Sequence, residues 1–406
     1  MRITYLHQHF RAPDSTGGTR SYEFARRFVD MGHTVELITA DSDPAGTATG
    51  AWSNRTIDGI HVHMLGVPYS NRMSFADRIS SFRQFAFGSA TRAAGIDADV
   101  IFATSTPLTI IIPAAFASWR MKVPVVFEVR DLWPEIPIAM GALQNPVLRF
   151  TARQLERFAY RMSAHIVALS PGMADGVNQV TGGTKPVSVI PNSADVSRFS
   201  SATPDREWMS RHFGVPPDKK VVLYGGTIGL ANAVSYLVTL AKQVQDLDES
   251  VVILVVGDGA EKEKVIELAG SSGVLDRAIF FGEPLAKDEM PKLLASVDMA
   301  CSVFLDIPEL THNSANKFFD ALAAAKPVAI NYGGWQSELL RESNAGIVLS
   351  ANDHHHAASS IVEKINDADW MRNASKAAYS LAVDRFNRDD HARDLIGILE
   401  KVAASA

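Results

Sequence analysis

Lys317 and Asp320 are charged residues three positions apart near the start of a predicted helix. At this spacing, both side chains project from the same side of the helix. A lysine beside free helical N–H groups suits a diphosphate, and a carboxylate suits the two hydroxyls of a ribose. The pair therefore indicates a nucleotide-binding site. The spacing leaves one alternative open, a solvated ion pair between the two side chains.

The residues around this pair predict where the helix begins and ends and which element follows it. Asn313 or Ser314 supplies a short polar side chain that can cap the helix, and Asn316 lies in its first turn. The helix is expected to end before the next proline, because the residue before proline avoids the helical region. A short buried strand over 328–330 follows, and the Gly333-Gly334 turn stops it. The backbone N–H groups of this turn are further candidates for phosphate binding.

Composition restricts the class of protein. The chain has 406 residues, is 47% hydrophobic and 21% charged, and is long enough for two domains. A single cysteine excludes an internal disulfide and a cysteine-based zinc site. No run of about 18 apolar residues occurs, and no apolar signal region follows the first residues, so we expect a cytoplasmic protein. Residues 1–195 carry a net charge of +2 and the remainder −8, which favours an anionic acceptor or surface for the first half.

Strands alternate with helices from the N-terminus onward, which predicts an α/β fold with parallel sheets. The first strand leads to the Gly17-Gly18 turn and a helix over 20–31. This turn lacks the G-x-G-x-x-G dinucleotide fingerprint. Two glycines allow backbone N–H groups to approach a phosphate or sugar, and an ordinary loop is the alternative.

Charged residues gather at the end of the buried strand over 125–129. Glu128, Arg130 and Asp131 lie at or just beyond its carboxyl end. Open α/β sheets bind ligands at this edge, so we predict a catalytic role for the three residues. A structural salt bridge within the loop is the alternative.

The second half offers two glycine-rich turns after apolar strands. Gly225, Gly226 and Thr227 follow the strand over 221–224, while Gly257 and Gly259 follow the strand over 251–256. A strand, a glycine-rich turn and a helix together make a diphosphate cradle. We therefore predict donor-phosphate contacts at these turns.

Several of these motifs, in this order, resemble family 4 glycosyltransferases. The run from Lys317 to Asp320 resembles a Lys-x-Phe-Glu motif whose acid contacts the nucleotide ribose in that family, although Ala325 stands where the family has glycine. The run Arg130-Asp131-Leu132-Trp133-Pro134 resembles bacterial O-antigen and capsule transferases of the L-fucosamine transferase type. The resemblance implies the GT-B fold, with two Rossmann-like domains facing a cleft. It places the domains at 1–195 and 196–386, with a last helix over about 387–406 packing back on the first domain.

The resemblance also implies a function. The chain would move a sugar from a nucleotide-sugar, most simply a UDP-sugar, to a glycan or polyprenyl-diphosphate-linked acceptor in surface polysaccharide biosynthesis. The transfer would retain the anomeric configuration and use no metal or cofactor. Lys317 would hold the diphosphate with the glycine-turn amides, and Asp320 the ribose. Glu128 or Asp131 would orient the sugar or acceptor, and Arg130 would lie near the developing charge.

Two rival functions remain open. One is a UDP-sugar 2-epimerase of GT-B type, and the other is a non-catalytic two-domain protein that binds sugar nucleotides. No extended basic patch with interleaved aromatic residues indicates nucleic-acid binding.

Two basic amphipathic segments predict peripheral contact with the inner face of a membrane. The segments over 69–94 and 147–162 each combine four arginines with an apolar stripe and a single acidic residue. Basic amphipathic helices bind anionic bilayer surfaces. The alternative is that both stripes pack on the domain core.

Overall fold

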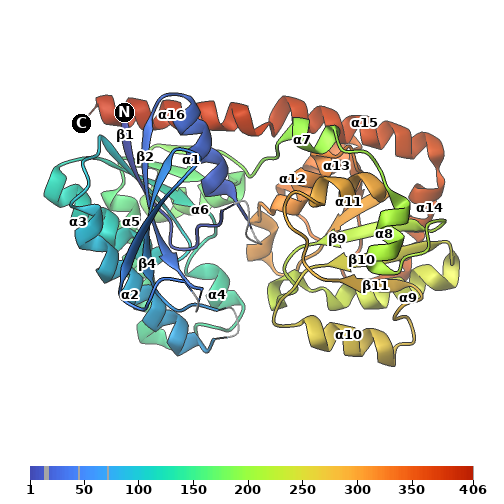
Figure 1. Ribbon diagram of the computed structural model, residues 1–406. Coiled ribbons are helices and arrows are strands. Elements are labelled where there is room, and N and C mark those ends of the chain that lie inside the picture. The colour runs from blue at the N-terminus through green and yellow to red at the C-terminus, as the bar shows by residue number, and fades with distance from the viewer. Residues whose placement is uncertain (13–17, 44–45, 71–72, 406) are drawn as a thin grey trace. The chain divides into compact units, whose positions relative to one another are not determined.

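The computed structural model describes residues 1–12, 18–43, 46–70 and 73–405, and it divides into two compact units. The first unit contains the N-terminal strand, residues 18–191 and the residues from Asp389 onward. The second contains residues 192–388. In each unit helices cover a sheet that is mainly or wholly parallel (Figure 1). The α/β fold expected from the alternation of strands and helices is therefore confirmed.

The first unit is built on an eight-stranded sheet of order β3-β4-β2-β1-β5-β6-β7-β8, in which only β3 and β4 pair antiparallel. Its strands are β1 (Arg2–Leu6), β2 (Thr34–Asp41), β3 (Trp52–Ile57), β4 (Ile60–Gly66), β5 (Val100–Thr104), β6 (Val125–Val129), β7 (His165–Ala168) and β8 (Val187–Val189). Its helices are α1 (Arg20–Asp30), α2 (Phe75–Ala93), η1 (Leu108–Ile110), α3 (Ile111–Met121), α4 (Glu135–Ala139), α5 (Pro146–Met162), α6 (Pro171–Thr181) and α16 (Arg388–Ala404).

Two separate cores lie on the two faces of this sheet. Residues of α1 and α16 form one core with side chains of β1 and β2, whereas α2, α3, α5 and α6 contribute to the other. This division follows from the strand order. The chain moves one way from β1 to β2 and the opposite way from β5 to β7, and right-handed crossovers then place the helices on opposite faces.

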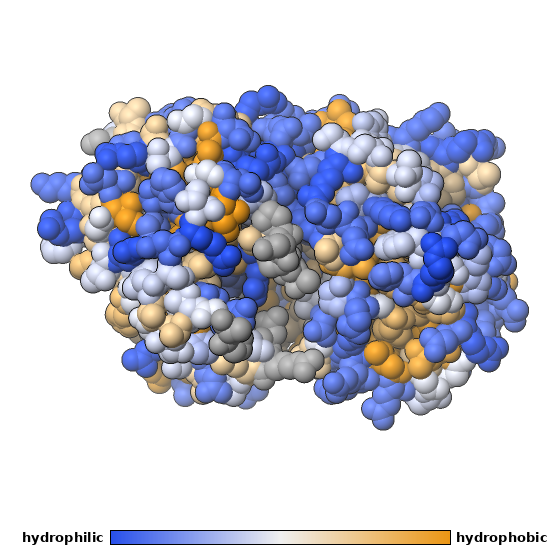
Figure 2. All heavy atoms as spheres, viewed as in Figure 1, coloured by the Kyte–Doolittle hydropathy of each residue, from blue (hydrophilic) through white to orange (hydrophobic). Residues whose placement is uncertain are grey.

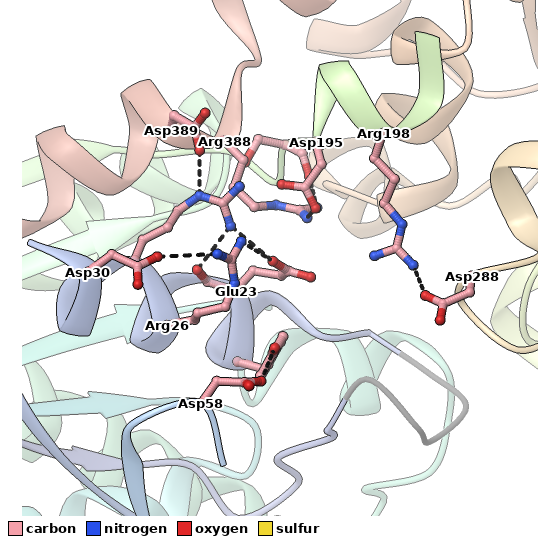
Figure 3. Close-up of polar contacts among 12 residues, drawn as sticks. Glu23, Arg26, Asp30, Asp58, Asp195, Arg198, Asp288, Arg388 and Asp389 are labelled. Carbon is pink, nitrogen blue, oxygen red and sulfur yellow. Dashed lines mark hydrogen bonds and ion pairs between the residues drawn. The ribbon is translucent and has the colours of Figure 1, made fainter. Parts of the chain in front are cut away.

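Helix α16 belongs to the first unit although it closes the chain. Its Leu395 and Leu399 are fully buried in the same core as Phe24 of α1. At its N-terminus, Asp389 accepts a bond from Arg27 Nε at 2.6 Å, within the group of contacts drawn around Glu23 and Asp389 in Figure 3. Apolar packing and an ion pair thus attach α16 to α1.

The second unit has six parallel strands in the order β11-β10-β9-β12-β13-β14. They are β9 (Lys220–Gly225), β10 (Val251–Val256), β11 (Ile279–Gly282), β12 (Met299–Ser302), β13 (Val328–Ile330) and β14 (Gly346–Val348). The helices are α7 (Val196–Ser200), α8 (Arg206–Phe213), η2 (Leu230–Asn232), α9 (Ser235–Leu247), α10 (Lys262–Ser271), α11 (Met290–Ser296), η3 (Pro308–His312), α12 (Asn316–Ala323), α13 (Trp335–Ser343), α14 (His354–Asn366) and α15 (Ala368–Arg385).

The capping prediction for α12 is wrong. Its N-cap is Ala315, and no side chain caps the helix. The Ser314 hydroxyl instead accepts the backbone N–H of Asn192 at 3.0 Å, and the Asn313 amide donates to the Leu310 carbonyl at 2.8 Å. Both side chains are therefore used to fix the preceding turn, and the first N–H groups of α12 have no side-chain partner.

The two segments predicted to contact a membrane differ in the structure. The stripe of α2 packs inward, because Phe82, Phe85 and Ala86 are buried in the first unit. Helix α5 instead leaves Val147 and Phe150 exposed. Apolar side chains are scattered among hydrophilic ones over the face shown in Figure 2. Within the described part of the chain, no helix combines the length and apolarity needed to span a bilayer.

Candidate functional site

Lys317 lies in the first turn of α12 with its ammonium against two aromatic rings. Its Nζ is 4.7 Å from the ring centroid of Tyr224 and 5.1 Å from that of Phe304. Burial lowers the pKa of Lys317 to about 8. Among the described residues no carboxylate forms an ion pair with it, and Asp320 in particular does not. Aromatic faces stabilise a cation only partly, so this ammonium is arranged to receive an anion.

Asp320 follows one turn later and is half-buried. Burial raises its pKa to about 6, and the positive charges of Arg388, Lys287 and Arg198 only partly oppose this. Arg388 itself pairs with Asp195 at 2.6 Å, as Figure 3 shows. These surroundings disfavour the ionised carboxylate, and a hydrogen-bond donor from a ligand would stabilise it.

The carboxyl ends of three neighbouring strands bring the other parts of this site together. Tyr224 is the last residue but one of β9, Phe304 follows β12, and the Gly333-Gly334 turn follows β13. These strands are adjacent in the sheet order β9-β12-β13. Because they are parallel, their carboxyl ends lie along one edge, where ligands bind in open α/β sheets.

The glycine-rich turns after β9 and β10 have different local roles. A Cβ at Gly257 would lie 1.9 Å from the Gly226 carbonyl oxygen, and one at Gly259 would lie 2.2 Å from that of Ile228. These two glycines therefore allow the two turns to pack backbone against backbone. A Cβ at Gly226 would lie 2.9 Å from Lys317 Cε. The turn Gly225-Gly226-Thr227 thus lies directly beside the lysine.

The glycines after β13 begin helix α13. Gly334 is its N-cap, with φ +84°, and a Cβ there would lie 2.5 Å from the Thr311 carbonyl oxygen. Gly333 has no atom within 4 Å of a Cβ built on it. No side chain caps α13, so its first amides lack a side-chain acceptor.

Glu128 does not take the position expected of a catalytic residue. It is fully buried, with Arg20 Nη2 at 2.9 Å from one oxygen and the Thr104 hydroxyl donating to the other at 2.5 Å. Arg20 also donates to the carbonyls of Ile190 and Pro191. Neither carboxylate oxygen is free to contact a substrate, which disagrees with the predicted catalytic role. The ion pair is structural, but its partner is Arg20 of α1 and not a residue of the same loop.

Arg130 and Asp131 remain accessible at the end of β6. Arg130 Nη1 contacts Nε2 of His7 at 3.3 Å, and its backbone N–H donates to the Ser105 hydroxyl at 3.0 Å. Burial raises the pKa of Asp131 to about 6. Gly18 is exposed two residues before α1, and Gly17 lies outside the described residues.

The sequence reasoning missed His7, Gln8 and Ser105 at the same edge of the first sheet. His7 and Gln8 follow β1, and Ser105 follows β5 directly. The rule that identified Arg130, a polar residue just past a parallel strand, could have found all three.

Comparison with protein families assigns both units. Residues 15–193 match a model described as a glycosyl transferase 4-like domain, and residues 205–381 match one described as glycosyl transferases group 1. The chain belongs to the GT-B glycosyltransferases. The two matches cover the parts of the chain that contain Arg130 and Lys317, respectively.

Relatives of this GT-B chain are distant. The 2-deoxystreptamine glucosyltransferase of Streptomyces kanamyceticus is 27% identical over 46% of both chains. The 2-deoxystreptamine N-acetyl-D-glucosaminyltransferase of Streptomyces fradiae is 24% identical over 63% of this chain and 61% of its own. The chain thus matches about half to three fifths of these relatives' length. The Anabaena protein HepE, solved with UDP and glucose, has a TM-score of 0.71 at 18% identity and covers 99% of this chain and 100% of its own.

Proposed function

We propose that the protein transfers a hexosyl or N-acetylhexosaminyl group from a nucleotide-sugar to a glycan or lipid-linked acceptor. One observation carries the proposal most directly. A lysine without a carboxylate partner lies in the first turn of α12, beside a glycine-rich turn, and a carboxyl group follows one helical turn later. Positive charge for a diphosphate and a carboxylate for a ribose are the two contacts that a nucleotide-sugar needs.

The donor in this proposal is a UDP-sugar. Lys317 binds the diphosphate, assisted by the amides of Gly225-Gly226-Thr227 and Gly333-Gly334, and Asp320 accepts from the ribose hydroxyls. Asn316 contributes its N–H group in the first turn of the same helix. The solved complex of HepE with UDP and glucose supports the choice of base, because that protein has the same fold.

The first unit supplies the catalytic groups in this proposal. Arg130 stabilises the negative charge that develops as the donor bond breaks, and Asp131 orients the transferred sugar or acceptor. Glu128 does not contact the substrate in this proposal and instead positions Arg20 through an ion pair. The transfer retains the anomeric configuration and needs no divalent ion or cofactor.

The acceptor in this proposal is a glycan or a polyprenyl-diphosphate-linked sugar in surface polysaccharide synthesis, such as O-antigen or capsule. The resemblance of the run from Arg130 to Pro134 to transferases of the L-fucosamine type supports this assignment. The protein would then act in the cytoplasm at the inner face of the membrane.

Helix α5 is the element proposed to contact that membrane. Val147 is 69% exposed and Phe150 is 64% exposed. The exposed arginines Arg153, Arg157 and Arg161 follow along the same helix. Apolar side chains beside basic ones are the combination that binds an anionic bilayer surface.

A binding and turnover series tests the function. Thermal shifts with a panel of nucleotides are expected to show stabilisation by UDP and UDP-sugars above that by other nucleotides. Product analysis with a UDP-sugar and a mixed acceptor pool should then show transfer to an acceptor. A new epimer formed from the UDP-sugar alone would establish the epimerase function instead, and binding without any turnover would indicate a non-catalytic protein.

A further inference from the structure

The sheet of the first unit has a topological switch point between β1 and β5. The connections on either side of these two strands run in opposite directions, and their helices cover opposite faces. Open α/β sheets bind ligands in the crevice outside the carboxyl ends of the strands at such a point. Here His7 and Gln8 follow β1, Ser105 follows β5, and Arg130 follows β6.

Two arginines near this point lack a carboxylate partner. Within the described residues, neither Arg11 nor Arg130 has a carboxylate oxygen within ion-pair distance, and Arg130 contacts only a histidine ring nitrogen through its guanidinium. The more deeply buried arginines of the chain behave differently. Arg20 and Arg27, for example, pair with Glu128 and Glu23 at 2.9 Å each. Arg130 is half-buried, and the Asp131 carboxyl, whose pKa its charge lowers, does not lie within ion-pair distance of it.

The two neighbouring histidines, His7 and His9, add no charge to this site. Burial is the main cause that lowers the pKa of His9 to about 4, and the charges of Arg11 and Arg130 lower it further. The same two arginines also act on His7, whose pKa is held well below its usual value mainly by burial. Both rings are therefore neutral near pH 7, and the positive charge at this edge is that of the two guanidinium groups.

The two residues that follow β1 carry unsatisfied polar atoms. Gln8 is 1% exposed, and neither its amide nitrogen nor its amide oxygen has a hydrogen-bond partner. The Nδ1 atom of His7, which is 3% exposed, also lacks a partner. Buried polar groups are normally paired, because leaving one unpaired costs free energy. Such atoms at a ligand-binding edge indicate that a partner from outside the chain completes the site.

We propose that Arg11, Arg130 and Gln8 form an oxyanion subsite that holds a phosphate or carboxylate group of the acceptor, and that Arg130 takes this role instead of contacting the charge that develops on the donor. That the anion belongs to the acceptor rests on the proposed glycosyl transfer, whereas the presence of an anion site rests on the arginines and Gln8 alone. The proposed acceptor differs from the one in the names of the two Streptomyces relatives. 2-Deoxystreptamine is a cation, and these arginines would repel it.

Calorimetry on the full chain tests the site, with UDP held at a saturating concentration so that the donor site is occupied. Inorganic pyrophosphate and malonate serve as the phosphate and carboxylate probes. We expect at least one of them to bind, and Arg130→Gln to weaken that binding by about tenfold or more through loss of a charge-assisted bond. Arg11→Gln should weaken it several-fold. Arg120→Gln, an exposed arginine of α3, is the matched control and should leave it unchanged.

Three results would overturn the proposal. They are no binding of either probe, equal affinities in the Arg130→Gln variant and the wild type, and binding that disappears whenever UDP is present. The last result would assign the arginines to the donor. If no nucleotide-sugar is turned over but pyrophosphate binding still depends on Arg130, the proposed function fails and the anion site stands. Circular dichroism and thermal melting of each variant check that the fold is intact.

Discussion

At the scale of single residues, the ionisation of Asp320 determines how it can contact a ribose. Burial raises the pKa of Asp320 to about 6, so the carboxyl is largely protonated at pH 5 and ionised at pH 7. An ionised carboxylate is the stronger acceptor for ribose hydroxyls. We therefore predict that uridine affinity rises as pH increases from 5 to 7. Asp320→Asn should remove this rise and weaken uridine binding at pH 7 by about 1–3 kcal/mol.

Calorimetry with uridine measures the effect without interference from phosphate titration. The same raised pKa makes ionisation of Asp320 unfavourable in the free protein, so its contribution to stability declines as pH rises from about 4 to 6. The Asp320→Asn variant should accordingly be no less stable than the wild type at pH 7. A uridine affinity that is equal in both proteins at pH 7 would remove Asp320 from the site.

Lys317 is predicted to discriminate between phosphate and nucleoside. Lys317→Ala should weaken UDP far more than uridine, because only UDP carries the diphosphate that the ammonium would contact. Since burial lowers the pKa of Lys317 to about 8, UDP affinity in the wild type should also fall between pH 7 and 8.5. The variant should show no such fall. Equal losses for UDP and uridine would mean that the lysine does not touch phosphate.

The sequence identified Lys317 and Asp320 because helical spacing alone places them on one side of α12. The rings that surround the lysine could not be found in this way. Tyr224 lies near the end of β9 and Phe304 follows β12, and only the strand order of the folded sheet brings them to α12. Tertiary proximity of this kind has no periodic signal in one sequence.

At the scale of elements, the glycine turns make a matched pair of predictions. Gly257→Ala should lower the free energy of unfolding by on the order of 1–3 kcal/mol, because its Cβ would lie 1.9 Å from the Gly226 carbonyl oxygen. It should also weaken UDP binding, since Gly226 lies beside Lys317. Gly333→Ala meets no atom within 4 Å and should change stability by less than about 0.5 kcal/mol. Chemical denaturation of both variants makes the comparison, and similar stabilities would contradict the packing argument.

The elements themselves were largely predictable, and side-chain direction was not. Apolar runs and turn residues located most strands to within a few residues, as for β6 and β10. The partner of Glu128 could not be predicted. Alternate residues of a strand point to opposite faces, and the sequence does not show which side chain each one contacts. Its partner Arg20 lies 108 positions earlier in the chain. Ala325 similarly adopts φ +55°, a conformation that its sequence neighbours do not reveal.

At the scale of the whole molecule, catalysis is predicted to be independent of a divalent ion. Lys317 and the uncapped starts of α12 and α13 can neutralise a leaving diphosphate without a cation. Transfer should therefore continue at an unchanged rate in excess EDTA, measured by release of UDP. Loss of activity with EDTA and recovery with magnesium or manganese would contradict the proposed chemistry.

Membrane contact through α5 is a second prediction at this scale. The protein should sediment with anionic liposomes at low salt and much less with neutral ones, because basic residues add about 1 kcal/mol each near an anionic surface. Phe150→Ser should reduce sedimentation. Leu268→Ser on α10, which removes a residue that is 39% exposed, is the control and should have no effect. Equal sedimentation with both lipids, or none, would leave α5 as an ordinary surface helix.

The position of α16 has a consequence for biosynthesis. The first unit buries Leu395 and Leu399 against residues that leave the ribosome more than 350 positions earlier, among them Phe24. Domains generally fold in the order of their synthesis. This one cannot complete its core until residues 192–388 have also been made. The nascent first unit is therefore expected to keep an apolar face exposed through about the second half of translation, until α16 has been made. A fragment ending near Pro191 would be expected to aggregate unless the α16 segment were supplied as a separate peptide.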